Sequence, residues 1–219
     1  MSERSVAQEY YVLAVNEKGA FPALSREESK AGLIAAGVAE LLLNGVIVLQ
    51  KKKIIAAAEL PENMRYLASL YEFLENKVRT TENLMNVYLT STGERLRRLA
   101  EEIGEELLEK HKAKKEKGGI FGNKTAYIPK EDYREKVIGL IKAAAADERE
   151  LSSCDLILIS LLKETKNLNR YLSDYERKKL KVKWKGIKEN PGSKQMAEII
   201  QYVKDMDTVM AASVITSLM

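Results

Sequence analysis

The side chains that most often carry enzyme chemistry are few in this 219-residue sequence. His111 is the only histidine, and it lies within a lysine-rich stretch where we expect an exposed side chain. Cys154 is the only cysteine, and it adjoins an apolar segment, where a free cysteine usually behaves as a small buried hydrophobe. A His–Cys pair would need these two residues to meet, and a Ser-His-Asp triad depends on the same histidine. The sequence therefore predicts no nucleophilic catalysis.

The glycines and the acidic pairs do not predict a catalytic or cofactor site either. Neither G-x-G-x-x-G nor the Walker spacing is present, and Gly118, Gly119 and Gly122 fit a hairpin. Neighbouring acids such as Glu101 and Glu102 have basic residues about one helical turn away, which favours solvated ion pairs. A single cysteine excludes an internal disulfide and is typical of a reducing compartment. We expect a cytoplasmic protein that is not an enzyme and has no cofactor and no metal.

An apolar loop followed by cations is the best candidate for a binding site. Phe21 and Leu24 lie directly before an expected helix, and Arg26 and Lys30 follow within its first turns. Free N–H groups and the dipole at the start of a helix favour phosphate, and each basic residue near an anionic surface adds about 1 kcal/mol. The pattern predicts a headgroup site whose Phe21 and Leu24 enter the membrane. The alternative is that both side chains only pack the helix onto the core.

Basic residues are unevenly distributed, although the formal net charge is only +4. Residues 177–188 contain seven lysines and arginines and no acid, and a second basic run covers residues 110–117. Such runs suit a solvated face, an anionic lipid surface or a nucleic acid. The longest uncharged stretch near the C-terminus, residues 208–219, is shorter than the roughly 20 residues that span a bilayer, and no signal peptide is recognisable. Any membrane contact is expected to be peripheral.

The elements that must position these residues are mostly helical. The spacing of apolar residues predicts helices at residues 5–19, 25–44, 61–76, 81–90, 91–115 and 130–146, and from residue 193 onward. Capping boxes are expected to open helices at Ser5, Ser25, Ser91 and Ser173, although the last segment could equally be an edge strand. Hairpins are expected from residues 46–50 with 54–57, and from residues 120–121 with 126–128.

Residues 156–162 are apolar on all sides, which is typical of a fully buried helix at the centre of a fold. The helix at 25–44 is rich in small residues and is also expected to be central. The sequence therefore predicts a mainly α protein, with a single helical domain over residues 5–219, a central buried helix and two small β-hairpins.

A winged-helix nucleic-acid-binding protein is the alternative, because the helix at 25–44 is followed by a hairpin with Lys51, Lys52 and Lys53 at its tip. Against it, this helix is apolar between Lys30 and Glu40 and so lacks the polar face of a recognition helix. The sequence therefore argues against nucleic acid as a partner.

Three segments, in this order and spacing, resemble the Golgi phosphoprotein 3 family. They are QEYYVLAVNEKG at residues 8–19, ELLLNGVI at residues 40–47, and the apolar helix at 156–172 followed by Tyr175 and Glu176. The resemblance covers nearly the whole chain from Ser5, and the lysine-rich composition is similar to that of a prokaryotic-type member. It implies a peripheral membrane protein that binds phosphatidylinositol 4-phosphate without catalysis.

The headgroup pocket of that family contains a tryptophan and three arginines. Here one arginine position corresponds to Arg97, whereas the other two fall at Ile34 and Ala100, and the loop has no tryptophan. The resemblance therefore implies that other cations would complete the site, namely Arg26, Lys30 or Arg98. Another anionic lipid stays open as the ligand.

Self-association through a hairpin is also implied by the resemblance, and it corresponds here to Ile120, Phe121 and Tyr127. A homo-oligomer is thus an expected assembly. Binding of protein tails in a helical groove, as an adaptor, is a further hypothesis that family membership allows.

Overall fold

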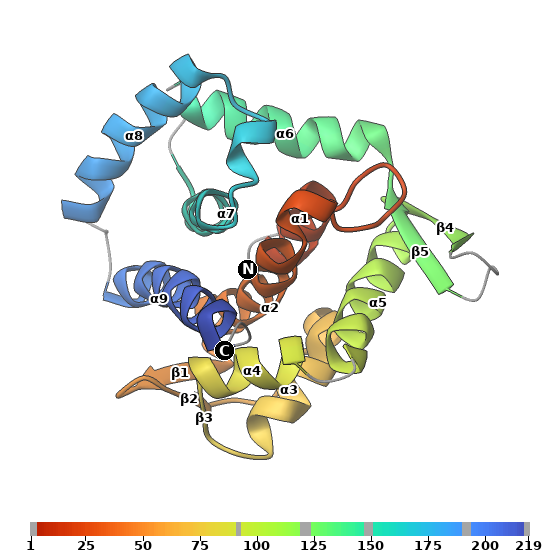
Figure 1. The fold of residues 1–219 in the computed structure, drawn as a ribbon, viewed down its shortest axis with the longest axis vertical. Helices are drawn as coiled ribbons and strands as arrows, with labels where there is room; N and C mark the ends of the chain where they lie inside the picture. Colours follow the sequence, from red (N-terminus) through yellow and green to blue (C-terminus); the bar gives the residue numbers. More distant parts are fainter. Residues whose placement is uncertain (1–3, 91–92, 119–123, 147–150, 190–193, 217–219) are drawn as a thin grey trace.

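The computed structural model describes residues 4–90, 93–118, 124–146, 151–189 and 194–216. Its α-helices in chain order are α1 (Val6–Ala14), α2 (Arg26–Leu43), α3 (Ala68–Glu75), α4 (Thr81–Thr90), α5 (Glu94–Glu109), α6 (Glu131–Ala145), α7 (Ser153–Glu164), α8 (Asp174–Glu189) and α9 (Lys194–Thr216). Short 3-10 helices are η1 (Ala23–Ser25), η2 (Glu62–Leu67) and η3 (Leu168–Arg170). In Figure 1, α1, α2 and α7 lie inside a ring formed by α4, α5, α6, α8 and α9. The predicted mainly α class is confirmed.

The strands form two small antiparallel sheets among the described residues. One sheet has the order β1 (Ile47–Gln50), β2 (Lys53–Ala56) and β3 (Arg79–Thr80), and the other pairs β4 (Ala113–Gly118) with β5 (Lys124–Pro129). The first predicted hairpin is confirmed. In the second, residues 126–128 form part of a strand as predicted, but their partners are Lys114, Lys115 and Glu116 and not residues 120–121. The two-residue strand β3 was not expected, because two residues are too few to show an alternating pattern.

Helix α2 is the centre of the fold. Every residue from Ala31 to Leu42 is buried, and the helix packs against α1, α4, α5, α7 and α9. Two glycines make this close packing possible. A Cβ at Gly32 would lie 1.9 Å from the Tyr10 hydroxyl oxygen, and one at Gly37 would lie 2.6 Å from Leu70 Cδ2. The small residues that predicted a central helix are therefore required by its neighbours.

Helix α7 is the second buried element, as its apolar sequence predicts. Its residues from Cys154 to Leu162 are buried, and it packs against α1, α2 and α9. One cluster of buried side chains extends along the chain from Val6 to Met206, so these helices share one hydrophobic core.

The long helix predicted at residues 91–115 ends earlier, at Glu109. His111 adopts a φ of 57°, and the Lys112 N–H donates to the Leu107 carbonyl oxygen at 2.7 Å, which closes the helix. The lysine-rich stretch that follows is strand β4, paired along its whole length with β5. Composition suggested a helix end, but pairing with a later strand decides the structure here.

The predicted helix starts agree with the structure in part, and the capping box predicted at Ser91 lies outside the described residues. The Ser5 hydroxyl accepts from the Gln8 N–H at 3.1 Å, and Ser173 and Glu176 form a capping box at the start of α8, which is a helix and not a strand. The capping box at Ser25 is wrong, since Ser25 makes no side-chain cap to α2. Its hydroxyl instead lies 3.5 Å from Asn167 Oδ1.

Replacement of Gly104 by alanine tests the contact between α5 and β5. A Cβ at this position would lie 2.3 Å from Cγ of Tyr127. We expect Gly104→Ala to lower the free energy of unfolding by about 1–3 kcal/mol, measured by urea denaturation, because the ring has to move. Gly139→Ala in α6 is the control, since a Cβ there would have no atom within 4 Å apart from its chain neighbours and the backbone of its own helix. It should raise stability by about 0.5–1 kcal/mol, and equal effects of both changes would contradict the packing described.

Candidate functional site

The two side chains predicted to enter the membrane differ in exposure, since Leu24 is exposed and Phe21 is anchored on the core. Leu24 lies on η1, and its side chain is 100% exposed. Phe21 is half-buried and packs against the core. The loop is held by Asn16, whose N–H donates to the Ala20 carbonyl oxygen at 2.8 Å and whose side-chain oxygen accepts from the Lys18 N–H at 2.9 Å. A folded turn therefore presents Leu24 to its surroundings.

The start of α2 is a surface and not an enclosed anion pocket. Arg26 is exposed and has no ion pair within the described parts of the chain. Lys30 pairs with Glu27 at 2.8 Å, and Glu28 pairs with Lys166 at 3.2 Å. Because two carboxylates already occupy the first turn, they satisfy the helix dipole where a phosphate would sit. Arg26 remains as the cation that can meet an anionic surface.

The other predicted cations lie elsewhere. Arg97 is 65% exposed and lies 3.8 Å from Glu101, while Arg98 pairs with Glu102 at 3.1 Å. Arg98 also lies 3.8 Å from Glu72 on α3. The start of α2 instead contacts Asn167, whose side-chain nitrogen donates to Ser29 Oγ at 2.9 Å. The structure thus does not bring Arg26 and Lys30 together with Arg97 and Arg98, and no four-cation site forms.

The predicted self-association hairpin lies only in part within the structure. Ile120 and Phe121 are outside the described residues. Tyr127 is buried at 5% exposure, and its hydroxyl donates to Glu105 Oε1 at 2.5 Å. Burial raises the pKa of Tyr127 to about 12, and its bond to Glu105 adds to the rise. Tyr127 therefore belongs to the packing between β5 and α5 and is not available to a second copy, so self-association stays a prediction for the rest of the hairpin.

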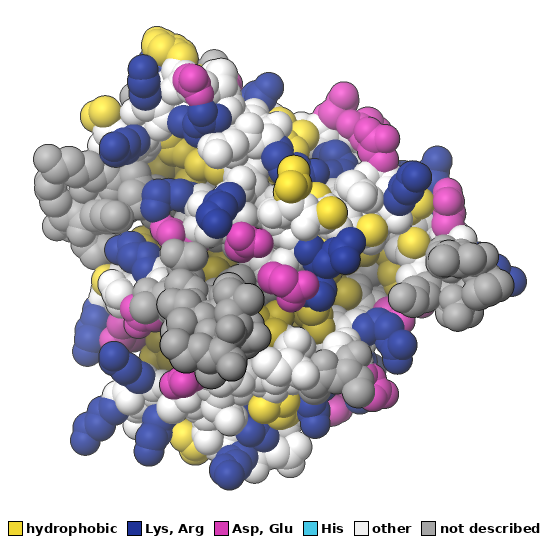
Figure 2. All heavy atoms as spheres, in the orientation of Figure 1, with side chains coloured by type: hydrophobic (Ala, Val, Ile, Leu, Met, Phe, Trp, Pro, Cys, Tyr) yellow, Lys and Arg dark blue, Asp and Glu magenta, His cyan; other side chains and the backbone are white. Residues whose placement is uncertain are grey.

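Helix α8 carries an amphipathic surface that the sequence indicated only by its charge. Tyr175 and Val182 are 66% and 76% exposed and lie two helical turns apart on one face. Lys178 and Lys179 are exposed between them, and Lys179 Nζ lies 5.0 Å from the centre of the Tyr175 ring. Figure 2 shows basic and hydrophobic side chains next to one another along the edge where α8 lies. This surface is a second candidate for contact with an anionic membrane.

The residues considered for catalysis occupy ordinary positions. His111 is exposed in the turn after α5, and Cys154 is buried with its thiol 3.9 Å from the Arg4 carbonyl oxygen. Within the described ranges, no group of three or more His, Cys, Asp and Glu residues could hold a metal ion. The helices of the same ranges include none with the length and hydropathy needed to cross a membrane.

The structure leaves the winged-helix alternative without a helix that could read DNA. Helix α2 is buried on all sides from Ala31 to Leu42, so it has no face that could enter a DNA groove. The predicted basic tip does form, with Lys51 and Lys52 at positive φ between β1 and β2. A basic hairpin tip without a reading helix gives no sequence-specific contact.

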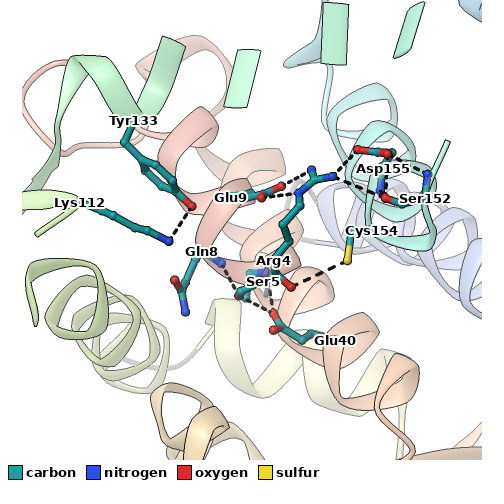
Figure 3. A network of polar contacts seen from close by, with 11 residues as sticks. Arg4, Ser5, Gln8, Glu9, Glu40, Lys112, Tyr133, Ser152, Cys154 and Asp155 are labelled. Atoms are coloured by element: carbon teal, nitrogen blue, oxygen red, sulfur yellow. Dashed lines mark hydrogen bonds and ion pairs between the residues drawn. The ribbon is translucent and has the colours of Figure 1, made fainter. Parts of the chain in front are cut away.

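A buried polar network joins the N-terminus to α2 and α7, and the sequence did not reveal it. Figure 3 shows the Arg4 guanidinium between Glu9 on α1 and Asp155 on α7. The two ion pairs measure 2.6 and 2.7 Å, and the carboxylate side chains are 3% and 0% exposed. The bond to Glu9 is the main reason that the pKa of Arg4 is raised. One arginine thus neutralises two buried acids.

Glu40 is the third buried acid of this region. Its carboxylate accepts from Ser5 Oγ and the Ala7 N–H, both at 2.8 Å, and from the Tyr66 hydroxyl at 2.5 Å. Burial raises the pKa of Glu40, and the three hydrogen bonds oppose that rise. A lone acid in an apolar helix could have been recognised from sequence as a residue with buried partners.

A pocket of about 600 Å³ lies beside these groups, lined among others by Arg4, Glu40, Tyr66 and Cys154. The chain's own donors engage both carboxylate oxygens of Glu40, and both acids at Arg4 are paired. Such an arrangement holds helices together, since each buried acid has its hydrogen-bond or ion-pair partners inside the chain.

Arg4→Ala tests the tie between α1 and α7. Removal of the guanidinium leaves two buried carboxylates without their cation, so we expect the free energy of unfolding to fall by about 3–5 kcal/mol in urea denaturation. Arg65→Ala is the matched control, because Arg65 and its partner Glu62 are 72% and 74% exposed. It should change stability by about 0–1 kcal/mol. A similar small effect of Arg4→Ala would show that the buried pairs contribute little.

Glu40→Gln tests the raised pKa. The folded chain retains the Glu40 proton above the ordinary pKa of 4.5, where the unfolded chain has lost it. The stability that protonated Glu40 contributes is therefore fully present below pH 4.5, and it is lost as the pH rises through the pKa of Glu40 in the folded chain. We expect the free energy of unfolding of the wild type to fall relative to that of Glu40→Gln as the pH rises above about 4.5. A pH-independent difference between the two urea midpoints would contradict the raised pKa.

Comparison with protein-family models matches residues 6–203 to the family described as Golgi phosphoprotein 3 (GPP34). The match begins with α1 and extends into α9, so it includes η1, the buried helices and α8. No curated protein matches the chain.

Proposed function

Because the chain belongs to the Golgi phosphoprotein 3 family, we propose that it binds, without catalysis, to the surface of membranes that expose anionic phospholipid headgroups. The observation that carries this proposal is Leu24, a fully exposed leucine on a folded turn. Removing a leucine side chain from water contributes about 1.5–3 kcal/mol, so an apolar membrane interface would stabilise this turn. Arg26 follows directly and supplies a positive charge that no carboxylate in the described residues neutralises.

Surface charge, more than one particular headgroup, is the proposed determinant of binding. Ile34 and Ala100 stand where the resembled family has pocket arginines. Ile34 is fully buried, and Ala100 is half-buried against the core. Neither position presents a cation, so neither supports selective recognition of phosphatidylinositol 4-phosphate. Peripheral binding through Leu24 and Arg26 needs only an apolar interface and negative charge.

Vesicle co-sedimentation with two single variants tests the contact. We expect Leu24→Ser and Arg26→Glu each to lower the partition coefficient on vesicles containing phosphatidylserine by about tenfold, since each removes about 1–2 kcal/mol of contact. Val78→Ser and Arg65→Glu are the controls, because Val78 is 48% exposed and Arg65 is 72% exposed away from η1. Equal losses for controls and test variants would contradict a localised contact.

Helix α8 provides the competing contact. If Val182→Ser lowers the partition coefficient and Leu24→Ser does not, the membrane meets α8, and the role proposed for Leu24 is wrong. Binding that is equal on neutral and anionic vesicles would contradict the electrostatic part of the proposal.

Headgroup selectivity is tested on vesicles of equal surface charge. We expect vesicles with phosphatidylinositol 4-phosphate and vesicles with phosphatidylserine to bind the protein within about threefold of one another, because charge dominates. A preference of about a hundredfold for the phosphoinositide would show that a selective pocket exists after all.

A further inference from the structure

Three arginines converge on a pocket of about 590 Å³ that lies away from η1 and α8. Arg79 comes from β3, and Arg95 and Arg98 come from the first turns of α5. The pocket is completed by side chains of α3 and α4, among them Phe73 and Tyr88. Its volume lies in the range of about 300–1,000 Å³ that is usual for small-molecule sites.

The Phe73 ring organises two of these arginines. The Arg79 guanidinium lies 3.6 Å from the ring centre and that of Arg95 lies 4.8 Å from it. Arg79 is further fixed by donating from Nε to the Phe73 carbonyl oxygen at 3.1 Å and from Nη1 to the Asn83 side-chain oxygen at 3.1 Å. Among the described residues, neither arginine pairs with a carboxylate. Two positive charges are thus held close together, which is costly unless an anion is shared between them.

The Tyr88 hydroxyl is the second, independent feature. Tyr88 is 1% exposed, its ring packs edge-on against Phe73 at 5.4 Å, and its side chain lines the pocket. Within the described parts of the chain, its hydroxyl makes no hydrogen bond. Burial raises the pKa of Tyr88, and the nearby charges of Arg95, Arg79 and Arg98 oppose the rise. The hydroxyl is therefore available in the pocket lining as a donor to a ligand oxygen.

The start of α5 adds to the preference for an anion. Gly93 precedes the helix at a φ of 73° and provides no side-chain cap. Glu94 and Arg95, in the first turn, line the pocket. The unpaired N–H groups of this turn and the helix dipole therefore lie at its rim.

Two carboxylates limit what the ligand can be. Glu72 and Glu94 line the pocket with the arginines, and Arg98 lies between Glu102 at 3.1 Å and Glu72 at 3.8 Å. A simple inorganic anion would use only the basic part of this lining. A ligand that also carries hydroxyl groups could donate hydrogen bonds to the carboxylates.

We propose that this pocket, which lies away from the turn and the helix proposed to meet the membrane, binds a soluble metabolite in which a polyol carries a phosphomonoester. The phosphate oxygens accept from Arg79, Arg95 and the Tyr88 hydroxyl, and the polyol hydroxyls donate to Glu72 and Glu94. Guanidinium groups suit phosphate because their planar donors bind two oxygens at once. The site does not depend on the membrane contact proposed for Leu24.

Isothermal titration of the full chain with glycerol 3-phosphate tests the pocket. Arg95→Ala should weaken binding by about tenfold or more, and Tyr88→Phe by about threefold to tenfold, because each removes a donor to the phosphate. Tyr88→Phe retains the ring contact with Phe73, so the fold should persist. Arg65→Ala removes the same charge outside the pocket and should leave binding unchanged.

Vesicles containing phosphatidic acid, which displays a phosphomonoester, are compared with vesicles containing phosphatidylglycerol, a diester. Binding of glycerol 3-phosphate that depends on Arg95 and Tyr88 supports a soluble ligand. Dependence seen only with phosphatidic acid would show a lipid ligand and contradict a soluble one. If neither probe binds, or if Arg95→Ala and Arg65→Ala have equal effects, the proposal is wrong. Leu24→Ser should not change the titration, which separates this site from the membrane contact.

Discussion

The close packing of α2 against its neighbours limits where every other element can lie. The Tyr10 hydroxyl lies close to the backbone at Gly32, and the Leu70 side chain lies close to it at Gly37. A methyl group at either position would prevent this approach of α1 and α3 to α2. Because α2 is covered on all sides, binding surfaces can form only at its ends and on the outer helices. The exposed turn η1, the outer face of α8 and the pocket between α3 and α5 are all at such positions.

Buried polar and charged groups complement this apolar packing near the C-terminal end of α2, where Glu40 lies. Arg4 and Glu40 each join segments that would otherwise meet only through apolar contacts, namely the N-terminus with α7 and α1 with η2. Helices that meet only through apolar side chains can shift slightly against one another. A buried polar group, in contrast, keeps its hydrogen bonds or ion pair in only one arrangement of the helices. Such residues can therefore select one relative placement of helices, even where they add little to total stability.

The fold was predictable where a local pattern matched the final environment. The small residues of α2, the apolar run of α7 and the hairpin around Lys51 each belong to one segment, and each was correctly placed from sequence. The end of α5 was not, because the lysines after His111 pair with a strand that begins at Lys124. The site was harder still. Arg26 and Arg97 both lie near helix starts, yet only the packing of α2 and α5 shows that they face different parts of the molecule. The pocket at Phe73 draws on α3, β3, α4 and α5, and no motif connects these segments.

The bond between Arg4 and Asp155 joins residues 151 positions apart, and this separation bears on how the chain folds during synthesis. At about 5–20 residues per second, ribosomes need roughly 8–30 s to extend the chain from the first of these residues to the second. During that interval Glu9 has its cation, but α1 has no α7 to pack against. Contacts of such high sequence separation also slow folding, because a long loop must close before they form. The nascent N-terminal helices therefore depend on late completion of the core, and they are the segments that a chaperone would have to protect.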